Sequence, residues 1–303
     1  MEYRIGVDIG GTSVKLAVVD SDFKVINKLR FPTGEEATSQ GIIDGIIENC
    51  RTLMEDYPIT AVGIGSAGRV DQKAGTVVVA GNLPFRNEPV VEKVSTALGV
   101  PVFIDNDGYT ALIGEIAAGV CKGCQDALII TIGTGIGGAI LLEGRLIRGR
   151  ENRAGELGHF IVKMDGIQCE CGLKGCFERY ASATGLIEQT EEAVKNNPES
   201  ILALEAKNGI NGKTPFDAKE KGCPVATELL SEYGRIFAAG LNSLIHIFQP
   251  EVIALSGGVS NQGDNLLDLI KPHLLPNANV KVTTLQSNGG IIGAALLGTE
   301  YAE

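Results

Sequence analysis

The stretch Asp8–Asp20 reads DIGGTSVKLAVVD, with two glycines between two apolar segments. Together with Arg4–Asp8 before it and Val25–Phe31 after it, this stretch alternates apolar and polar residues in short runs, a pattern that predicts β-strands. We expect a three-stranded antiparallel meander with Gly10 and Gly11 in its first turn. The stretch after the glycines is rich in β-branched residues, and its spacing matches neither a P-loop nor a dinucleotide fingerprint, so we do not expect a Rossmann or P-loop fold.

The same plan recurs at Leu128–Leu142, LIITIGTGIGGAILL, where a buried strand meets a glycine-rich turn and then resumes. Backbone N–H groups at such turns can hold an anion, and Thr12 and Lys15 would add donors at the first turn. The first turn alone could equally be a tight hairpin without a ligand. A third glycine turn, Leu255–Ser260 (LSGGVS), precedes a helical stretch and would suit a nucleoside or its phosphates. Two phosphate-sized turns imply two related halves.

Helical and strand patterns alternate with short connections, which predicts an α/β protein. Helices are expected near Thr38–Asp56, Glu88–Leu98, Thr110–Ala118, Thr227–Gln249 and Asp264–Lys271. Further strands are expected at Thr60–Gly68, Thr76–Gly81, Val100–Ile104 and Val252–Leu255. The polar segment Lys195–Gly222 is interpreted as a surface excursion rather than a domain linker.

Two carboxylates follow the strand Val100–Ile104, at Asp105 and Asp107 on either side of Asn106. A carboxylate at the carboxyl end of a strand, where a helix begins, is well placed to meet a ligand over the sheet edge. Asp before a helix is also a common cap, and the residues alone leave both interpretations open.

The segment Glu156–Glu178 reads ELGHFIVKMDGIQCECGLKGCFE. His159, Cys169, Cys171 and Cys176 supply the imidazole and three thiolates of a closed tetrahedral zinc site. The alternative is a set of buried or disulfide-bonded cysteines, although Cys169 and Cys171 are too close in sequence to pair comfortably. Because all four positions would be filled by protein, the metal is predicted to order a loop and not to activate water.

The composition narrows the class of protein. The chain has 303 residues with 44% hydrophobic content, enough for a large core and by size for two domains. A net charge of -11 argues against nucleic acid or an anionic membrane as the main partner and favours small molecules. The first motif begins within ten residues of Met1, no apolar run is long enough to span a bilayer, and the cysteines suit a reducing compartment, so we predict a cytoplasmic protein. The remaining cysteines are interpreted as ordinary thiols.

Seven motifs, in chain order, resemble the ROK family, the repressor, open reading frame and sugar kinase group of the actin-like ATPase superfamily. They are DIGGTSVK, GSAGRVD, IDNDGYTALIGE, TIGTGIGGAI, AGELGH, CECGLKGCFE and LSGGVS. The resemblance implies two ribonuclease H-like domains around a central cleft. These would be residues 1–117 with a C-terminal helix at 290–303, and residues 118–289 with a zinc-binding loop at 159–176. A homodimer is usual among such proteins.

The resemblance also implies an ATP-dependent sugar kinase that phosphorylates the 6-hydroxyl of a hexose, as a glucokinase does. Asp107 would be the general base, and Asn106 would hold neighbouring hydroxyls. The other implied sugar-binding residues are Gly68, Arg69, Asn82, Glu156, His159 and Glu178. Asp8 would hold Mg²⁺, and the ATP phosphates and adenosine would contact Gly10, Gly11, Thr12, Lys15, Gly133, Thr134, Gly135, Gly257 and Gly258.

One departure concerns the acceptor. Glucokinases of the family commonly have GxPGxVD where this chain has GSAGRVD, and Arg69 looks more like N-acetylmannosamine kinases. N-acetylmannosamine is therefore an alternative acceptor, and the family resemblance leaves a β-glucoside as another. A sugar-sensing regulator is a further alternative, but regulators of this family carry an added DNA-binding domain, and only seven residues precede Asp8. An ATPase of the chaperone or filament type would not explain the zinc cluster.

Overall fold

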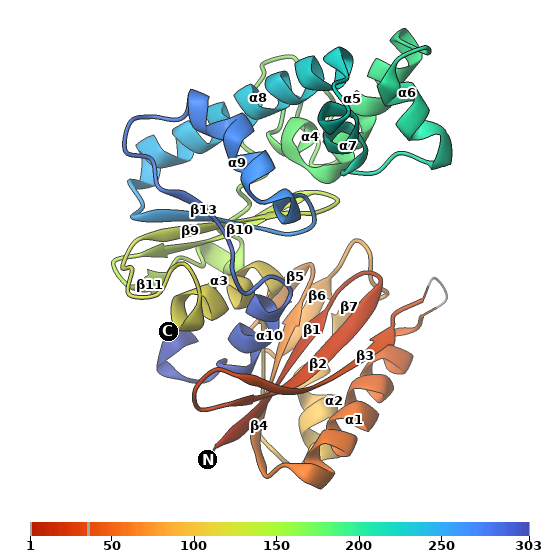
Figure 1. Ribbon diagram of the computed structural model, residues 1–303. Helices are drawn as coiled ribbons and strands as arrows, with labels where there is room; N and C mark the ends of the chain where they lie inside the picture. The colour runs from red at the N-terminus through yellow and green to blue at the C-terminus, as the bar shows by residue number, and fades with distance from the viewer. Residues whose placement is uncertain (1, 35–36, 303) are drawn as a thin grey trace. The chain divides into compact units, whose positions relative to one another are not determined.

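The computed structural model describes residues 2–34 and 37–302 (Figure 1). The chain forms two compact units: Met1–Gln125 with Ala139–Gly155 and Thr284–Glu303, and Asp126–Gly138 with Glu156–Thr283. The predicted domains, 1–117 with 290–303 and 118–289, stay a prediction. They differ from the compact units chiefly because Ala139–Gly155 belongs with the first unit.

The first unit contains a five-stranded sheet with the strand order β3-β2-β1-β4-β8. Its strands are β1 (Tyr3–Ile9), β2 (Ser13–Asp20), β3 (Val25–Pro32), β4 (Ile59–Ser66) and β8 (Val102–Asn106). The first three are antiparallel neighbours, so the predicted meander is confirmed, whereas β4 is parallel to both β1 and β8. β3 is an edge strand that alternates half-buried and exposed residues, whereas β2 is buried along most of its length.

Helices cover both faces of this sheet. They are α1 (Ser39–Asp56), α2 (Val90–Leu98), α3 (Asp107–Ala118) and α10 (Asn288–Ala295). The Thr38 side chain caps α1 by accepting from the Gly41 N–H at 3.1 Å, and α1 buries one apolar stripe, Ile42, Ile43, Ile46, Cys50 and Leu53. A small antiparallel sheet, β5 (Arg69–Asp71), β6 (Thr76–Val79) and β7 (Arg86–Glu88), extends the connection from β4 to α2.

The backbone of α10 lies directly on the sheet because glycines face it. Gly6 on β1 and Gly63 on β4 are register partners. A Cβ atom at Gly6 would overlap the carbonyl of Ile291, and one at Gly63 would overlap the carbonyl of Ala294. The contact with α3 is equally close, since a Cβ at Gly114 would overlap the Gly289 carbonyl. The position of α10 therefore depends on the absence of side chains at these sites.

The second five-stranded sheet has the order β11-β10-β9-β12-β13. Its strands are β9 (Ala127–Ile132), β10 (Ile136–Leu142), β11 (Arg145–Leu146), β12 (Val252–Ser256) and β13 (Val280–Val282). β12 is parallel to β9 and β13. The helices that follow β9 in the second unit are α4 (Glu178–Ala181), α5 (Ala183–Asn196), α6 (Ile201–Glu205), α7 (Thr214–Glu220), α8 (Pro224–Phe248) and α9 (Asp264–Ile270).

The α8 helix is the long apolar helix that the spacing predicts. It starts with Pro224 in its first turn and ends at Phe248, and the next residue, Gln249, adopts the left-handed conformation. Its buried face includes Leu230, Tyr233, Phe237, Leu241 and Leu244. Short 3-10 helices occur at Arg150–Asn152, Ala206–Asn208, Val259–Gln262, Lys271–His273 and Glu300–Ala302.

Most predicted elements are present within a few residues, but two segments differ. The excursion at 195–222 folds into α6 and α7, and it buries Leu202, Phe216 and Ala218. Short helices need only a few apolar residues to pack against the core. In a polar segment these few residues do not form a recognisable helical pattern. The C-terminal helix expected at 290–303 is shorter, since α10 spans Asn288–Ala295, and position 303 lies outside the described residues. Within residues 2–34 and 37–302, no helix combines the length and apolar content needed to cross a bilayer.

The close approach of α10 gives a stability prediction. Gly63→Ala should destabilise the protein by about 3 kcal/mol, because the new methyl group meets backbone that cannot rotate away. Thermal and urea unfolding would measure this loss. Gly212→Ala is the matched control, since its Cβ would meet only Val259 at 3.8 Å. A change at Gly63 as small as the change at Gly212 would contradict the packing argument.

Candidate active site

Asn106 caps α3 and fixes the junction between β8 and that helix. Its side-chain oxygen accepts from the Gly108 N–H at 2.8 Å, and its side-chain N–H donates to the Gly68 carbonyl at 2.9 Å. The predicted capping alternative for Asp105 or Asp107 is therefore wrong, because Asn106 is the cap. Gly68 has a φ of +94° and lies against Val79 and Ala80, so only glycine fits there.

Asp107 is the first residue of α3 and is exposed to solvent. One carboxylate oxygen accepts from the Gly108 N–H at 2.9 Å. Desolvation by the surrounding protein, and then the negative charge of Asp8, raise the pKa of Asp107 to about 6. Such a carboxylate is ionised at neutral pH and accepts a proton more readily than an ordinary Asp, as a general base requires.

Asp105, in contrast to Asp107, is buried and paired with other side chains of the protein. Its side chain is 2% exposed, forms an ion pair with Arg148 and accepts from the Asn106 N–H at 2.8 Å. The Arg148 guanidinium also lies 4.8 Å from the ring centroid of Tyr109 and donates to the Ala302 carbonyl at 3.1 Å. Arg148 was missed by sequence reasoning, because no local pattern links it to an aspartate 43 positions away.

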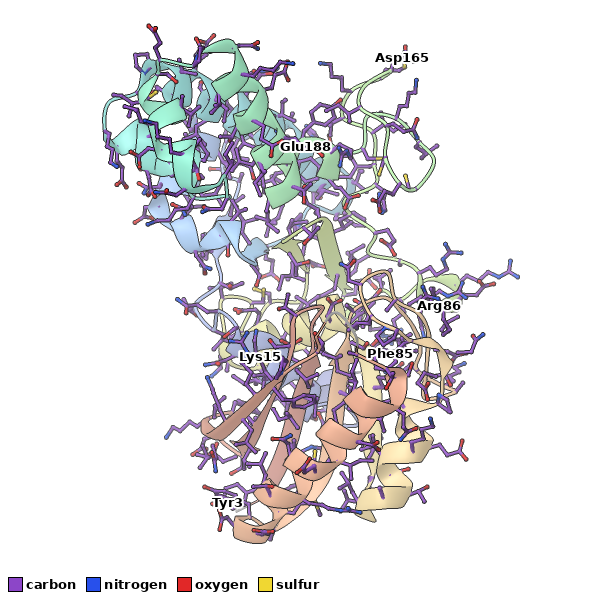
Figure 2. The ribbon with its side chains drawn as sticks, turned by 90° about the vertical axis from the view of Figure 1, so that its right-hand side faces the viewer. Tyr3, Lys15, Phe85, Arg86, Asp165 and Glu188 are labelled. Carbon is purple, nitrogen blue, oxygen red and sulfur yellow. The ribbon has the colours of Figure 1, made fainter. Side chains whose placement is uncertain are left out.

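Asp8 lies at the end of β1, close to the start of α10. Its carboxylate is 3.7 Å from the Lys15 amine, and its carboxyl carbon would lie 3.8 Å from a Cβ at Gly290. Burial raises the pKa of Asp8, and the charge of Lys15 opposes that rise. Lys15, labelled in Figure 2, thus faces a carboxylate of its own unit.

The turn after β1 leaves two of its backbone N–H groups available to a ligand. Thr33 donates its hydroxyl to the Gly11 carbonyl at 2.7 Å and its N–H to the Thr12 carbonyl at 3.2 Å. In the part of the chain that the structure describes, the N–H groups of Gly11 and Thr12 have no hydrogen-bond partner, whereas the N–H of Gly10 donates to Ser13. This arrangement suits an anion.

The loop between β6 and β7 places Asn82 beside this turn, since a Cβ at Gly11 would lie 3.2 Å from that of Asn82. Arg86 holds the loop by donating to the carbonyls of Ala80 at 2.8 Å and Phe85 at 2.7 Å. Sequence reasoning missed Arg86, because its hydrogen bonds go to backbone atoms. Arg69 lies exposed at the start of β5.

In the second unit, the glycine turn after β9 is held by the segment that follows the cysteines. The Gly133 N–H donates to the Gly135 carbonyl at 3.0 Å, and the Ala183 N–H donates to the Gly133 carbonyl at 2.9 Å. The Ile136 N–H donates to the Glu178 carboxylate at 3.0 Å. Gly133 and Thr134 themselves are exposed, as a ligand-binding turn requires.

The four predicted metal ligands come together. The ligand atoms of His159, Cys169, Cys171 and Cys176 all lie within 4.8 Å of one another. The His159 Nδ1 is 3.6 Å from the Cys169 sulfur, and the sulfurs of Cys171 and Cys176 are 3.5 Å apart. Zn–S bonds of about 2.3 Å and Zn–N bonds of about 2.0 Å in a tetrahedron place ligand atoms about 3.5–3.8 Å apart. The donor set and its spacing therefore fit Zn²⁺.

The orientation of His159 separates its two nitrogens. The Nδ1 atom faces Cys169 and lies 3.7 Å from Glu178, whereas the Nε2 atom lies 3.9 Å from the Glu156 carboxylate. Glu156 is largely exposed, with a side-chain exposure of 68%. The Nδ1 atom can thus join the cysteine cluster as a metal ligand, while the Nε2 atom can form a hydrogen bond with a polar ligand.

Gly257 and Gly258 follow β12 and have different environments. Gly257 has a φ of +93°, and a Cβ there would meet the backbone of Ile132 at 2.5 Å. Packing between strand ends therefore accounts for Gly257 being a glycine. Gly258 has no atom within 4 Å of an added Cβ, which leaves open space beside its backbone.

The predicted site residues therefore form two groups, one in each compact unit. The first unit brings together Asp8, the 10–12 turn and Asn82, while Asn106 contacts Gly68 and the charge of Asp8 acts on Asp107. The second unit brings together the 133–135 turn, Glu178, His159 and the three cysteines.

Known proteins are similar to this chain along nearly its whole length. The ROK family profile matches residues 4–300, and the chain belongs to the ROK family. It is 37% identical to a glucokinase of Streptomyces coelicolor, over 99% of this chain and 98% of that protein. It is 32% identical to a glucokinase of Thermotoga maritima, over 96% and 95%.

Among solved structures, the fold is similar to that of a ROK family glucokinase from Streptomyces griseus in complex with glucose and AMPPNP. The TM-score is 0.84 at 37% identity, with 97% of this chain and 98% of that chain covered. The chain therefore has the two-domain, actin-like ATPase fold of ROK kinases, and the predicted fold class is confirmed.

The buried ion pair gives a second stability prediction. Arg148→Met should cost about 3 kcal/mol, because it leaves Asp105 buried without a counter-charge. The loss should be larger at pH 8 than at pH 5, since an unpaired buried carboxyl can take up a proton in acid. Arg150→Met is the control, because the Arg150 side chain is 94% exposed. Equal thermal stabilities of the two variants at pH 8 would refute the structural role of the pair.

Proposed function

We propose that this protein transfers the γ-phosphoryl group of ATP to the 6-hydroxyl of a hexose, with glucose as the first acceptor to test. The observation that carries the proposal is the Asp107 carboxylate, which is solvent-exposed, begins a helix and has its pKa raised to about 6 beside Asp8. Glucokinases at 37% and 32% identity over nearly the whole chain support the same activity.

In this mechanism Asp107 accepts the proton of the attacking hydroxyl while Asn106 keeps the start of α3 in place. The two glycine turns, 10–12 and 133–135, would donate backbone N–H groups to the phosphates. Mg²⁺, when bound, neutralises charge on the phosphates, and Asp8 is the residue that would hold it. Lys15, 3.7 Å from Asp8, adds a positive charge to the same region.

The sugar would be held by carboxylates and amides. Glu156 and Glu178 can accept hydrogen bonds from adjacent hydroxyls, and the His159 Nε2 can donate one when Nδ1 binds a metal. Asn82 and the 68–69 pair would also contact the sugar. The adenosine would lie against Gly257 and Gly258, where the open space beside Gly258 supports the proposal.

We also propose that the protein binds a structural zinc ion, with His159, Cys169, Cys171 and Cys176 as its ligands. The metal would fix the loop that carries His159 and leads to Glu178, and so would order one wall of the sugar site. Figure 2 shows this loop, with Asp165 labelled at its outer end.

Removal of one thiolate tests the zinc site. Cys171→Ser should lower the zinc content from one ion per chain to nearly none and should reduce the affinity for sugar by roughly tenfold or more. Elemental analysis and sugar titration measure the two effects. The exchange of Cys124, which lies outside the cluster, for Ser is the control. Full zinc content in the Cys171 variant would remove this residue from the ligand set.

Loss of the base tests the mechanism. Asp107→Asn should lower kcat by about a hundredfold to ten-thousandfold. The variant should be no less stable at pH 8, because the raised pKa means that the folded protein disfavours the charged carboxylate above pH 6. In the unaltered protein, kcat/KM for the sugar should fall as the pH drops through about 6. Asp56→Asn, at the exposed end of α1, is the control; near-normal turnover of Asp107→Asn would eliminate the proposed base.

The acceptor is best identified by ATP consumption with Mg²⁺ and a panel of glucose, N-acetylmannosamine, N-acetylglucosamine, mannose and a β-glucoside. Arg69, exposed at the start of β5, is the residue that favours N-acetylmannosamine. If zinc-loaded protein that binds ATP consumes no ATP with any sugar of the panel, the result would favour a sugar-sensing regulator. The homodimer stays a prediction, which light scattering of the purified protein would test.

A further inference from the structure

The Glu178 carboxylate contacts two parts of the second unit at once. Its Oε2 atom accepts from the Ile136 N–H at 3.0 Å, where the glycine turn returns to β10. Its Oε1 atom lies 3.4 Å from the Cys169 sulfur and 3.7 Å from the His159 Nδ1. The side chain is 19% exposed, so a ligand can still reach it. One carboxylate therefore connects the glycine turn with the His-Cys cluster.

The conformation of the turn depends on this carboxylate. Ile136 is 3% exposed, so its N–H would lose its partner if the carboxylate were removed. A Cβ atom at Gly135 would overlap Oε2, which shows how closely the turn is packed against the carboxylate. The Glu178 backbone is itself fixed, because its N–H donates to the Gly158 carbonyl at 2.9 Å. Glu178 is thus a rigid support for the turn.

We propose that Glu178 is a positioning residue for nucleotide binding, in addition to being a sugar ligand. It holds the 133–135 turn in the conformation whose N–H groups meet the phosphates, and it couples sugar occupancy to the turn. This inference rests on the proposed kinase function. Because coupling between two binding sites is reciprocal, sugar and nucleotide change each other's affinity by the same factor.

The two roles are compatible, because an ionised carboxylate offers about four acceptor positions and Ile136 uses one of them. The sugar-binding role and the positioning role predict different nucleotide affinities for Glu178 variants in the absence of sugar. A residue that only binds sugar has no effect on nucleotide affinity when no sugar is present. A residue that shapes the phosphate-binding turn affects nucleotide affinity under all conditions.

The test is calorimetric titration of the sugar-free, zinc-loaded protein with Mg²⁺ and AMPPNP. Glu178→Ala should bind AMPPNP roughly tenfold to a hundredfold more weakly, as expected for the loss of a hydrogen bond to a charged group. Glu178→Gln keeps an acceptor oxygen for the Ile136 N–H, so it should retain AMPPNP affinity to within about threefold while sugar affinity falls about tenfold. Glu192→Ala on the exposed face of α5 should match the unaltered protein.

Unchanged AMPPNP affinity in Glu178→Ala would overturn the inference while leaving the kinase proposal intact. Absence of both kinase activity and AMPPNP binding in the unaltered protein would instead overturn the proposed function. If Glu178→Ala loses zinc, Gly135→Ala gives the same test from the other side, because its methyl group displaces the carboxylate. The zinc-loaded Gly135→Ala variant should then bind AMPPNP roughly tenfold more weakly, and unchanged AMPPNP affinity in that variant would overturn the inference.

Discussion

The backbone contact between α10 and the first sheet is the constraint on which the first half of the site depends. Gly6 and Gly63 leave room for the carbonyls of Ile291 and Ala294, and Gly114 lets α3 approach the start of the same helix. Arg4 then donates to the carbonyls of Ala295 and Leu297, which fixes the far end of α10 on β1. Because β1 carries Asp8 and α3 begins with Asp107, the same packing sets the two carboxylates whose repulsion contributes to the raised pKa of Asp107.

Buried polar groups hold the junction between β8 and α3 in place, as close glycine contacts hold α10. The Arg148 guanidinium pairs with Asp105, stacks on Tyr109 and reaches the carbonyl of Ala302. The Tyr109 hydroxyl donates to the carbonyls of Ile147 at 2.7 Å and Ala154 at 3.0 Å. Desolvation makes such a network costly, so its value lies in specifying one arrangement of three distant chain segments.

In the second unit, a single carboxylate performs a comparable function. Glu178 supports the turn after β9 and lies against the predicted metal ligands, while Arg179 next to it is held by Glu188 at 2.6 and 2.8 Å. Tyr180 continues this role, because its hydroxyl accepts from the Ile167 N–H at 2.8 Å within the cysteine loop. Three consecutive residues thus connect α4 to the turn, to α5 and to the cysteine loop. The groups proposed to bind nucleotide and those proposed to bind sugar therefore share one local constraint.

The sequence by itself determined the elements and the chemistry that depend on local pattern. The meander around Gly10, the long helix α8 and the predicted ligand set of the cysteine loop follow from periodicity, turn residues and ligand types that neighbours in the chain already specify. The tertiary structure alone decided which polar residues are structural. Asn106 rather than Asp107 became the cap, Arg148 became the partner of Asp105, and Glu178 became a support for the turn as well as a candidate ligand. These roles join residues tens of positions apart through burial and hydrogen bonds, and only the folded backbone brings such groups within reach of one another.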